Sequence, residues 1–161
     1  TFSVLVYAEG FTIGANLEFV DGDFSGEAFD GGFGLQVGYE FKEQGNWQYG
    51  VLFEGLSLWN DEEDLYNAGE MVYDSRSLFA TARPTNWPVI FKAGIVDAEY
   101  KVLLQNDTQN FREVNDTGYA VGIGLVMGNE TFRVNLLDIQ HIKVGGETFT
   151  SYGITLAIFA H

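Results

Sequence analysis

The chain has 161 residues, a formal net charge of −15, no cysteine, two prolines and 20 glycines. The negative charge disfavours nucleic acid and anionic surfaces as direct partners, and the lack of cysteine excludes disulfides and thiolate metal sites. The length suits one domain over residues 1–161, and no run of about 18 apolar residues predicts a transmembrane helix.

The most regular stretch of the chain is Gly32–Lys42, in which every second residue is apolar. Phe33, Val37 and Phe41 fall on one face of an extended segment, while glycines and charged residues fall on the other. About ten residues of such alternation is the length of a tilted strand that crosses a bilayer. The stretch therefore predicts a membrane-spanning β-strand with its apolar face toward lipid.

The same alternation recurs along the chain and predicts eight strands. In chain order they are Gly10–Val20, Gly32–Lys42, Trp47–Trp59, Met71–Arg83, Pro88–Val102, Gly118–Met127, Thr131–Lys143 and Phe149–Phe159. The connections between them alternate between long and short over most of the chain. An antiparallel up-and-down barrel puts every second connection at the same end. We therefore expect an all-β, eight-stranded transmembrane barrel with tight turns and both termini at one rim and long loops at the other.

Many of the acidic residues lie in the long connections, so the loop rim should be strongly negative. Asp21, Asp23 and Ser25 place oxygens at the first, third and fifth positions of a calcium-loop pattern, but its twelfth position is Gly32 where a bidentate glutamate is needed. A specific calcium site and a solvated acidic loop both remain open. Taken together, the acidic loops are expected to recruit Ca²⁺ or Mg²⁺ loosely, and no other cofactor is expected.

Charged residues also occupy the polar face of the strands. Because side chains fill the interior of an eight-stranded barrel, and because buried charges must be paired, these residues predict an interior ion-pair network. We expect Glu54 to pair with Arg76, and Lys92 and Arg133 to lie near Glu40. Such a network would plug the barrel, and the alternative is a transport path or proton relay. The predicted network comprises Glu18, Glu40, Glu54, Asp74, Arg76, Lys92 and Arg133.

Three segments resemble small eight-stranded outer-membrane β-barrels, namely the OmpA-like transmembrane domain and its opacity-protein and porin-like relatives. The segments are Phe91–Gly94 (FKAG), Gly118–Leu136 and Ser151–Phe159. The resemblance implies a bacterial outer-membrane location, with lipid and lipopolysaccharide as neighbours. It also implies a structural or surface-interaction role in which the loops bind a protein or surface ligand that the sequence does not identify.

Two other functions remain open. A soluble lipocalin-like barrel would turn the aromatic face inward around an apolar ligand. A lipid-modifying outer-membrane enzyme would need a serine partner for His141, which alternation places inside the barrel without one, so no enzymatic activity is expected. Glycine packed on the polar face, and aromatic residues near the strand ends, favour lipid outside.

Overall fold

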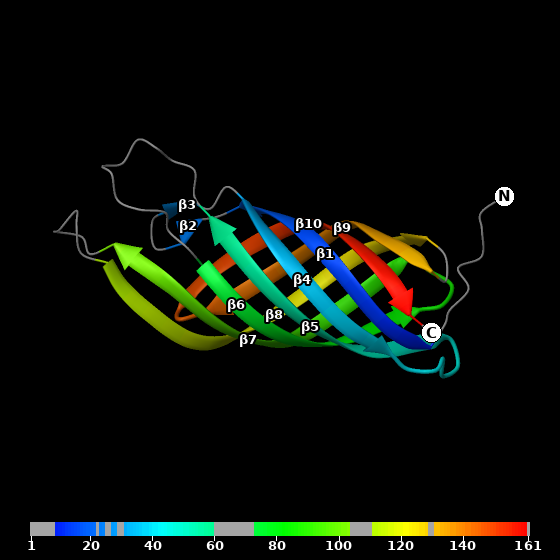
Figure 1. The fold of residues 1–161 in the computed structure, drawn as a ribbon. Coiled ribbons are helices and arrows are strands. Elements are labelled where there is room, and N and C mark those ends of the chain that lie inside the picture. The colour runs from blue at the N-terminus through cyan, green and yellow to red at the C-terminus, as the bar shows by residue number, and fades with distance from the viewer. Residues whose placement is uncertain are drawn as a thin grey trace.

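The computed structural model describes residues 9–21, 23–24, 27–28, 31–59, 73–103, 111–128 and 131–160. Eight long antiparallel strands close into a barrel, which confirms the predicted fold class (Figure 1). Within the described ranges, no helix is long and apolar enough to cross a membrane. The barrel strands are β1 (Gly10–Asp21), β4 (Gly31–Glu40), β5 (Trp47–Trp59), β6 (Tyr73–Pro84), β7 (Val89–Leu103), β8 (Phe111–Gly128), β9 (Phe132–Val144) and β10 (Glu147–Ala160).

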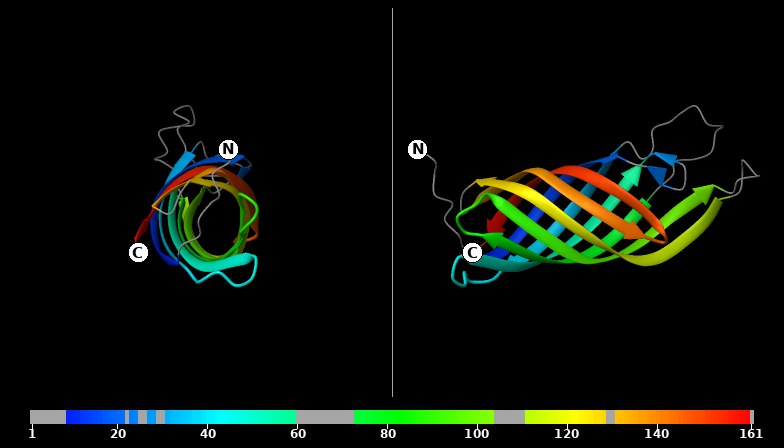
Figure 2. Two further views of the ribbon diagram at one scale, coloured as in Figure 1. Left: turned by 90° about the vertical axis from the view of Figure 1, so that its right-hand side faces the viewer. Right: turned by 180° about the vertical axis from the view of Figure 1, so that it is seen from behind.

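Each barrel strand pairs with its neighbours in sequence, and β1 closes the barrel by pairing with β10. Phe11 lies opposite Ala160, so the start of β1 and the end of β10 sit at the same end as the tight turn at Gly45. This is the short-turn end. A small two-stranded sheet of β2 (Asp23–Phe24) and β3 (Glu27–Ala28) lies at the opposite, loop end (Figures 1 and 2).

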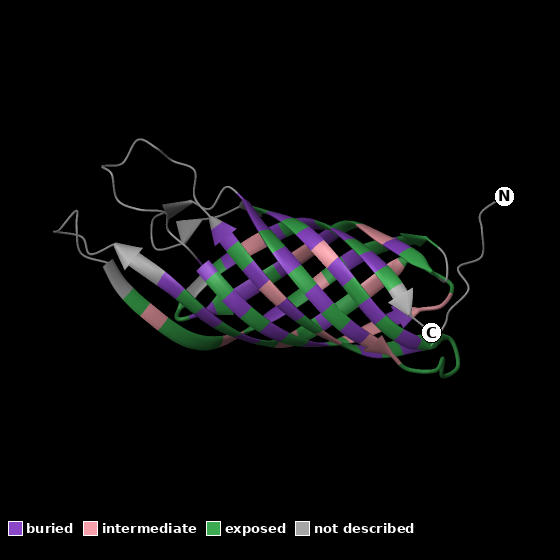
Figure 3. Cartoon of the chain, in the orientation of Figure 1, coloured by how far each residue is buried: buried purple, intermediate pink, exposed green. Residues whose placement is uncertain are grey.

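The outer and inner faces alternate residue by residue, which gives the chequered burial pattern in Figure 3. Large apolar side chains point outward on every barrel strand; Ile13, Leu35 and Ile158 are 61%, 60% and 58% exposed. The lipocalin-like alternative required this face to enclose a ligand, and the observed orientation contradicts it. The apolar face of the barrel is its outside.

Strand β8 begins at Phe111, seven residues before the Gly118 predicted from alternation. Its first residues pair with β7 as far as Phe111 opposite Leu103, whereas pairing of β8 with β9 begins only at Tyr119. Strands β7 and β8 therefore reach beyond β9 at the loop end (Figure 2). The connection between β9 and β10 is a tight turn at Gly145 and Gly146, both with positive φ.

Strand β9 contains a bulge that reverses its alternation. Asp138 lies opposite Gly153 but Asn135 lies opposite Thr155, so β9 has one more residue than β10 over this interval. Leu136 and Leu137 are consequently both exposed. Beyond the bulge, the residues at even positions from Asp138 onward face inward.

Candidate functional site

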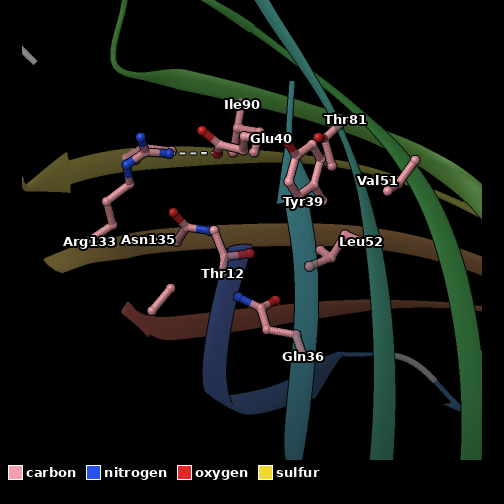
Figure 4. Close-up of a pocket in the computed structure, with 12 residues that line it drawn as sticks. Thr12, Gln36, Tyr39, Glu40, Val51, Leu52, Thr81, Ile90, Arg133 and Asn135 are labelled. Carbon is pink, nitrogen blue, oxygen red and sulfur yellow. Dashed lines mark hydrogen bonds and ion pairs between the residues drawn. The ribbon is translucent and has the colours of Figure 1, made fainter. Parts of the chain in front are cut away.

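The first charged cluster of the interior lies near the short-turn end and is centred on Glu40. Its carboxylate oxygens lie 3.1 Å from Nη2 of Arg83 and 2.6 Å from Nη1 of Arg133. Arg83 also donates to Oε1 of Gln48 at 2.7 Å. Figure 4 shows the Arg133–Glu40 pair beside a small pocket of about 50 Å³ that Thr12 also lines. This space is large enough for a water molecule or two.

The second charged cluster lies in the middle of the barrel around Lys92. The Nζ atom of Lys92 lies 2.6 Å from Oδ2 of Asp138 and 3.9 Å from Oε2 of Glu54. Asn16 donates to Glu18 at 2.8 Å and to Glu54 at 3.4 Å. All five side chains are at least 95% buried. In the low-dielectric interior, removing any one of these side chains would leave another buried polar or charged group without its partner, which is costly.

Glycine provides the room for these long side chains. A Cβ at Gly122 would lie 2.8 Å from Cε of Lys92, and a Cβ at Gly14 would lie 2.8 Å from Nε2 of Gln36. At either position, the neighbouring side chain would have to move to admit a Cβ. The inward glycines are therefore complementary to the inward polar residues on neighbouring strands.

The structure places five of the seven predicted network residues inside the barrel and two outside. Glu18, Glu40, Glu54, Lys92 and Arg133 face inward, whereas Asp74 and Arg76 are exposed. The prediction that Asp74 and Arg76 are interior, and that Arg76 pairs with Glu54, is therefore wrong. Lys92 takes the place expected of Arg76 beside Glu54. Arg83, Asp138 and Gln140 are interior residues that the sequence analysis missed.

The interior is not polar along its whole length, which corrects the expectation of a fully polar plug. Toward the loop end, buried apolar side chains fill the barrel, and Tyr73 packs edge-on against Phe149 with ring centroids 5.3 Å apart. Tyr73 is thus an aromatic residue near a strand end that faces inward instead of toward lipid. This apolar cluster consists of Leu56, Leu58, Tyr73, Phe79, Val96, Ala98, Tyr100, Ala120, Ile142, Val144 and Phe149.

The outer face changes from apolar to polar at the level where the inner face changes from polar to apolar. On β6, β7 and β8, the outward residues are apolar from the short-turn end up to Leu78, Ile95 and Tyr119, and polar beyond them. Strands in this region are thus polar outside and apolar inside, the reverse of the rest of the barrel. The polar collar is the set of outward residues Asp74, Arg76, Asp97, Glu99, Glu113, Asn115 and Thr117.

Within the polar collar, one pair of opposite charges and one pair of like charges lie across from each other on β6 and β7. Arg76 lies opposite Asp97 across the β6–β7 ladder, whereas Asp74 lies opposite Glu99, and like charges in that position repel. A hydroxyl of Ser57 donates to Asp74. Together with Ser57 and Gly55, these collar residues line an open hollow of about 470 Å³ on the outer surface.

The structure describes the predicted calcium-loop residues only in part, and it places His141 on the outside of the barrel. Asp21 ends β1 and Asp23 begins β2, but Ser25 lies outside the described residues, so the calcium-loop pattern stays a prediction. His141 is exposed, not interior, because the bulge in β9 reverses its side, and its Nδ1 lies 3.3 Å from Oγ1 of Thr150. Among the described residues, no group of three or more His, Cys, Asp or Glu side chains could hold a metal ion.

No protein-family model and no curated protein sequence matches the chain. The β-barrel domain of Pseudomonas aeruginosa OprF has a TM-score of 0.57 at 12% identity, covering 92% of this chain and 96% of that one. Yersinia pestis Ail in a phospholipid nanodisc has a TM-score of 0.55 at 13% identity, covering 94% and 99%. Ail in complex with the heparin analogue sucrose octasulfate has a TM-score of 0.56 at 17% identity, covering 93% and 96%.

At these identities the likeness establishes a shared fold. The chain has the fold of the small eight-stranded outer-membrane β-barrels, and the resemblance stated from the sequence is confirmed at that level. The matches extend over nearly the full length of both partners, so the barrel corresponds to the whole of each matched barrel chain.

Proposed function

We propose that the protein is a bacterial outer-membrane β-barrel whose loop end projects into water and binds another macromolecule at the cell surface. The observation that carries the proposal is the reversal of polarity at the level of Leu78, Ile95 and Tyr119. Below it, the barrel exposes apolar side chains, which suit lipid. Above it, the barrel exposes charged side chains over an apolar core, which suits water.

Aromatic residues mark both borders of the apolar surface. Trp47 and Trp87 are exposed near the short-turn end, and Phe19 and Phe33 are exposed toward the loop end. Such girdles lie at the two interfaces of a bilayer. We infer that lipid surrounds the strands between these borders and that lipopolysaccharide adjoins the collar.

The collar favours a cationic partner. Four of its seven residues are acidic, and Arg76 is its one basic residue. Complementary charge speeds encounter and suppresses partners of the same sign. A polyanion such as the heparin analogue that Ail binds would be repelled by this surface, so we propose a basic protein surface as the partner.

The double substitution Asp97→Asn and Glu99→Gln should abolish most partner binding without unfolding the barrel. Both side chains are exposed, so their loss removes attraction and leaves the interior intact. Wild-type and variant barrels in nanodiscs would be compared by surface plasmon resonance against a basic protein of known surface charge, at low and high salt. Glu43→Gln, at the short-turn end, is the matched control and should bind like the wild type. Equal binding by all three proteins would contradict the role of the collar.

The wild-type barrel should show no steady ion conductance in a planar bilayer. One charged cluster occupies the interior near the short-turn end and the other its middle, while the apolar cluster occupies the loop end. An eight-stranded barrel has little space beyond its own side chains. Single-channel recording on the purified protein would test this. Long-lived openings in every preparation would show that a water path passes the clusters, and would favour a transport role.

The proposal assigns no catalytic role to the protein. The descriptions of the structural neighbours name a β-barrel domain and an attachment invasion locus protein. His141 contacts Thr150 on the outside of the barrel, and within the described part of the chain no serine hydrogen-bonds to it. The loosely bound divalent cations expected at the acidic loops stay a prediction.

A further inference from the structure

The outer face of β9 and β10 carries basic and hydroxyl side chains where its apolar surface ends toward the loop end. Ile139 is the last apolar outward residue of β9 and Tyr152 is that of β10, and the two lie opposite each other across the ladder. The outward residues that follow them are polar. We call this set the basic border, and it consists of His141, Lys143, Thr148 and Thr150. The basic border therefore adjoins the apolar surface of the barrel directly.

The register of β9 and β10 places each base of the border beside a hydroxyl. His141 lies opposite Thr150, and Lys143 lies opposite Thr148. The Nδ1 atom of His141 is 3.3 Å from Oγ1 of Thr150. When this hydroxyl donates to Nδ1, the neutral ring carries its proton on Nε2, which can then donate to a ligand. With the three donor protons of the Lys143 ammonium group, the basic border presents hydrogen-bond donors that suit an anion.

The basic border differs in charge from the polar collar. Its two bases lie opposite Tyr119 and Val121 of β8, which are uncharged. The acidic position Asp21 of β1 lies opposite Thr150, so β10 separates it from β9. The four acids of the collar lie on β6, β7 and β8. The net charge of −15 therefore does not describe this side of the barrel, and an anion that the collar repels can bind here.

We propose that the basic border binds the phosphate group of an anionic membrane lipid. The inference rests on the membrane location given under the proposed function, and it adds the side of the barrel and the residues that the lipid contacts. A lipid whose acyl chains lie against Ile139 and Tyr152 places its headgroup phosphate beside His141 and Lys143. The long stem of lysine lies along an apolar surface while its ammonium group reaches the headgroup layer. A soluble anion would lack the apolar contacts that hold the lipid at this border.

The test compares two lipids with the same acyl chains and different headgroups. Barrels refolded into a nonionic detergent are mixed with equal amounts of dimyristoyl phosphatidic acid and dimyristoyl phosphatidylcholine, whose choline group neutralises its phosphate. Bound lipids are counted by native mass spectrometry. The wild type should prefer phosphatidic acid by about fivefold, the gain expected from one cation beside an anionic headgroup. Equal binding of the two lipids would overturn the proposal. Inorganic phosphate at the lipid concentration should not displace the lipid, and displacement would show that the site takes soluble phosphate instead.

Three variants locate the lipid. Lys143→Gln should lower the preference for phosphatidic acid about fivefold, whereas Lys143→Arg keeps the charge and should retain the preference. Arg76→Gln is the matched control, because it removes the same charge from the outer face at the same end, where Arg76 lies opposite Asp97. It should bind lipid like the wild type. Equal losses in Lys143→Gln and Arg76→Gln would show that overall charge governs binding, and would contradict the basic border.

Insertion into vesicles separates a failure of this inference from a failure of the proposed function. Both substituted side chains are exposed, so all variants should fold and insert like the wild type. Barrels that insert into phosphatidylcholine vesicles but show no preference for phosphatidic acid would refute the basic border alone. A wild-type barrel that inserts into no vesicle would refute the proposed membrane location, and the lipid site with it.

Discussion

Replacing Lys92 with methionine should lower the free energy of unfolding by about 3–5 kcal/mol, because it leaves buried carboxylates without their cation. Lys92 lies within 2.6 Å of Asp138 and within 3.9 Å of Glu54. It also lies 5.2 Å from the ring centre of Phe79, an attraction that methionine would lose. The measurement is urea unfolding in detergent micelles or bilayers, with EDTA present so that no added metal compensates for the lost charge.

The matched control for Lys92 is Lys143→Met, on the outer face of β9. Its side chain is exposed, so its loss should change the unfolding free energy by no more than about 0.5 kcal/mol. Adding Asp138→Asn to Lys92→Met should restore part of the stability, since it removes one of the stranded charges. Equal stabilities for Lys92→Met and Lys143→Met would show that the mid-barrel cluster is not structurally required.

Placing arginine at Val37 should cost about 2–4 kcal/mol in a bilayer, the penalty for a cation on the lipid-facing side near mid-membrane. Val37 is 50% exposed and lies between Ile13 of β1 and Phe53 of β5, which also point outward. The arginine could not reach a carboxylate on these neighbours. Reversible unfolding from lipid vesicles would give the free energy directly.

Asn115→Arg is the control for Val37→Arg because it puts the same side chain on the outer face of β8, within the polar collar. There water surrounds the guanidinium and Glu99 lies opposite, so stability should be unchanged or slightly higher. If both arginine variants are equally stable, the belt around Val37 does not face hydrocarbon. A penalty at both positions would instead place the collar inside the membrane.

The sequence predicts the strands well where the outer face of the barrel is apolar along the whole strand. The segment Trp47–Trp59 was bounded correctly as β5, and Gly32–Lys42 differs from β4 (Gly31–Glu40) by one residue at its start and two at its end. Alternation identifies such strands because apolar residues face out and small or polar residues face in along most of their length. The same signal gave the inward positions of Glu18, Glu40 and Glu54.

The failures occur where that single rule no longer holds. Alternation predicts that Asp74 and Arg76 face inward because it places polar residues on the inner face, but beyond Leu78 the outer surface is itself polar. Arg76 and Arg83 are seven residues apart, an odd spacing in one strand, so only one of them can face inward, and it is Arg83. The reversed polarity also concealed the first residues of β8.

Asp138 was missed for a different reason, since a bulge changes which side every following residue faces. No glycine or proline marks the bulge at Leu136 and Leu137, where two leucines are simply adjacent. Reading alternation straight through this pair puts Asp138 outside and His141 inside, the reverse of their observed positions. Two consecutive outward leucines were the available signal, and they could have indicated an extra residue in β9.

In the membrane orientation proposed above, the polar collar would also fix the depth of the barrel in the bilayer. Sinking by one outward position, about 5 Å along the membrane normal for a tilted strand, would carry Arg76 and Asp97 into hydrocarbon. Rising by the same distance would lift Leu78 and Ile95 out of it, with a loss of buried apolar area. Movement of the barrel along the membrane normal would be unfavourable in both directions, so its loops should stay at a constant height above the bilayer.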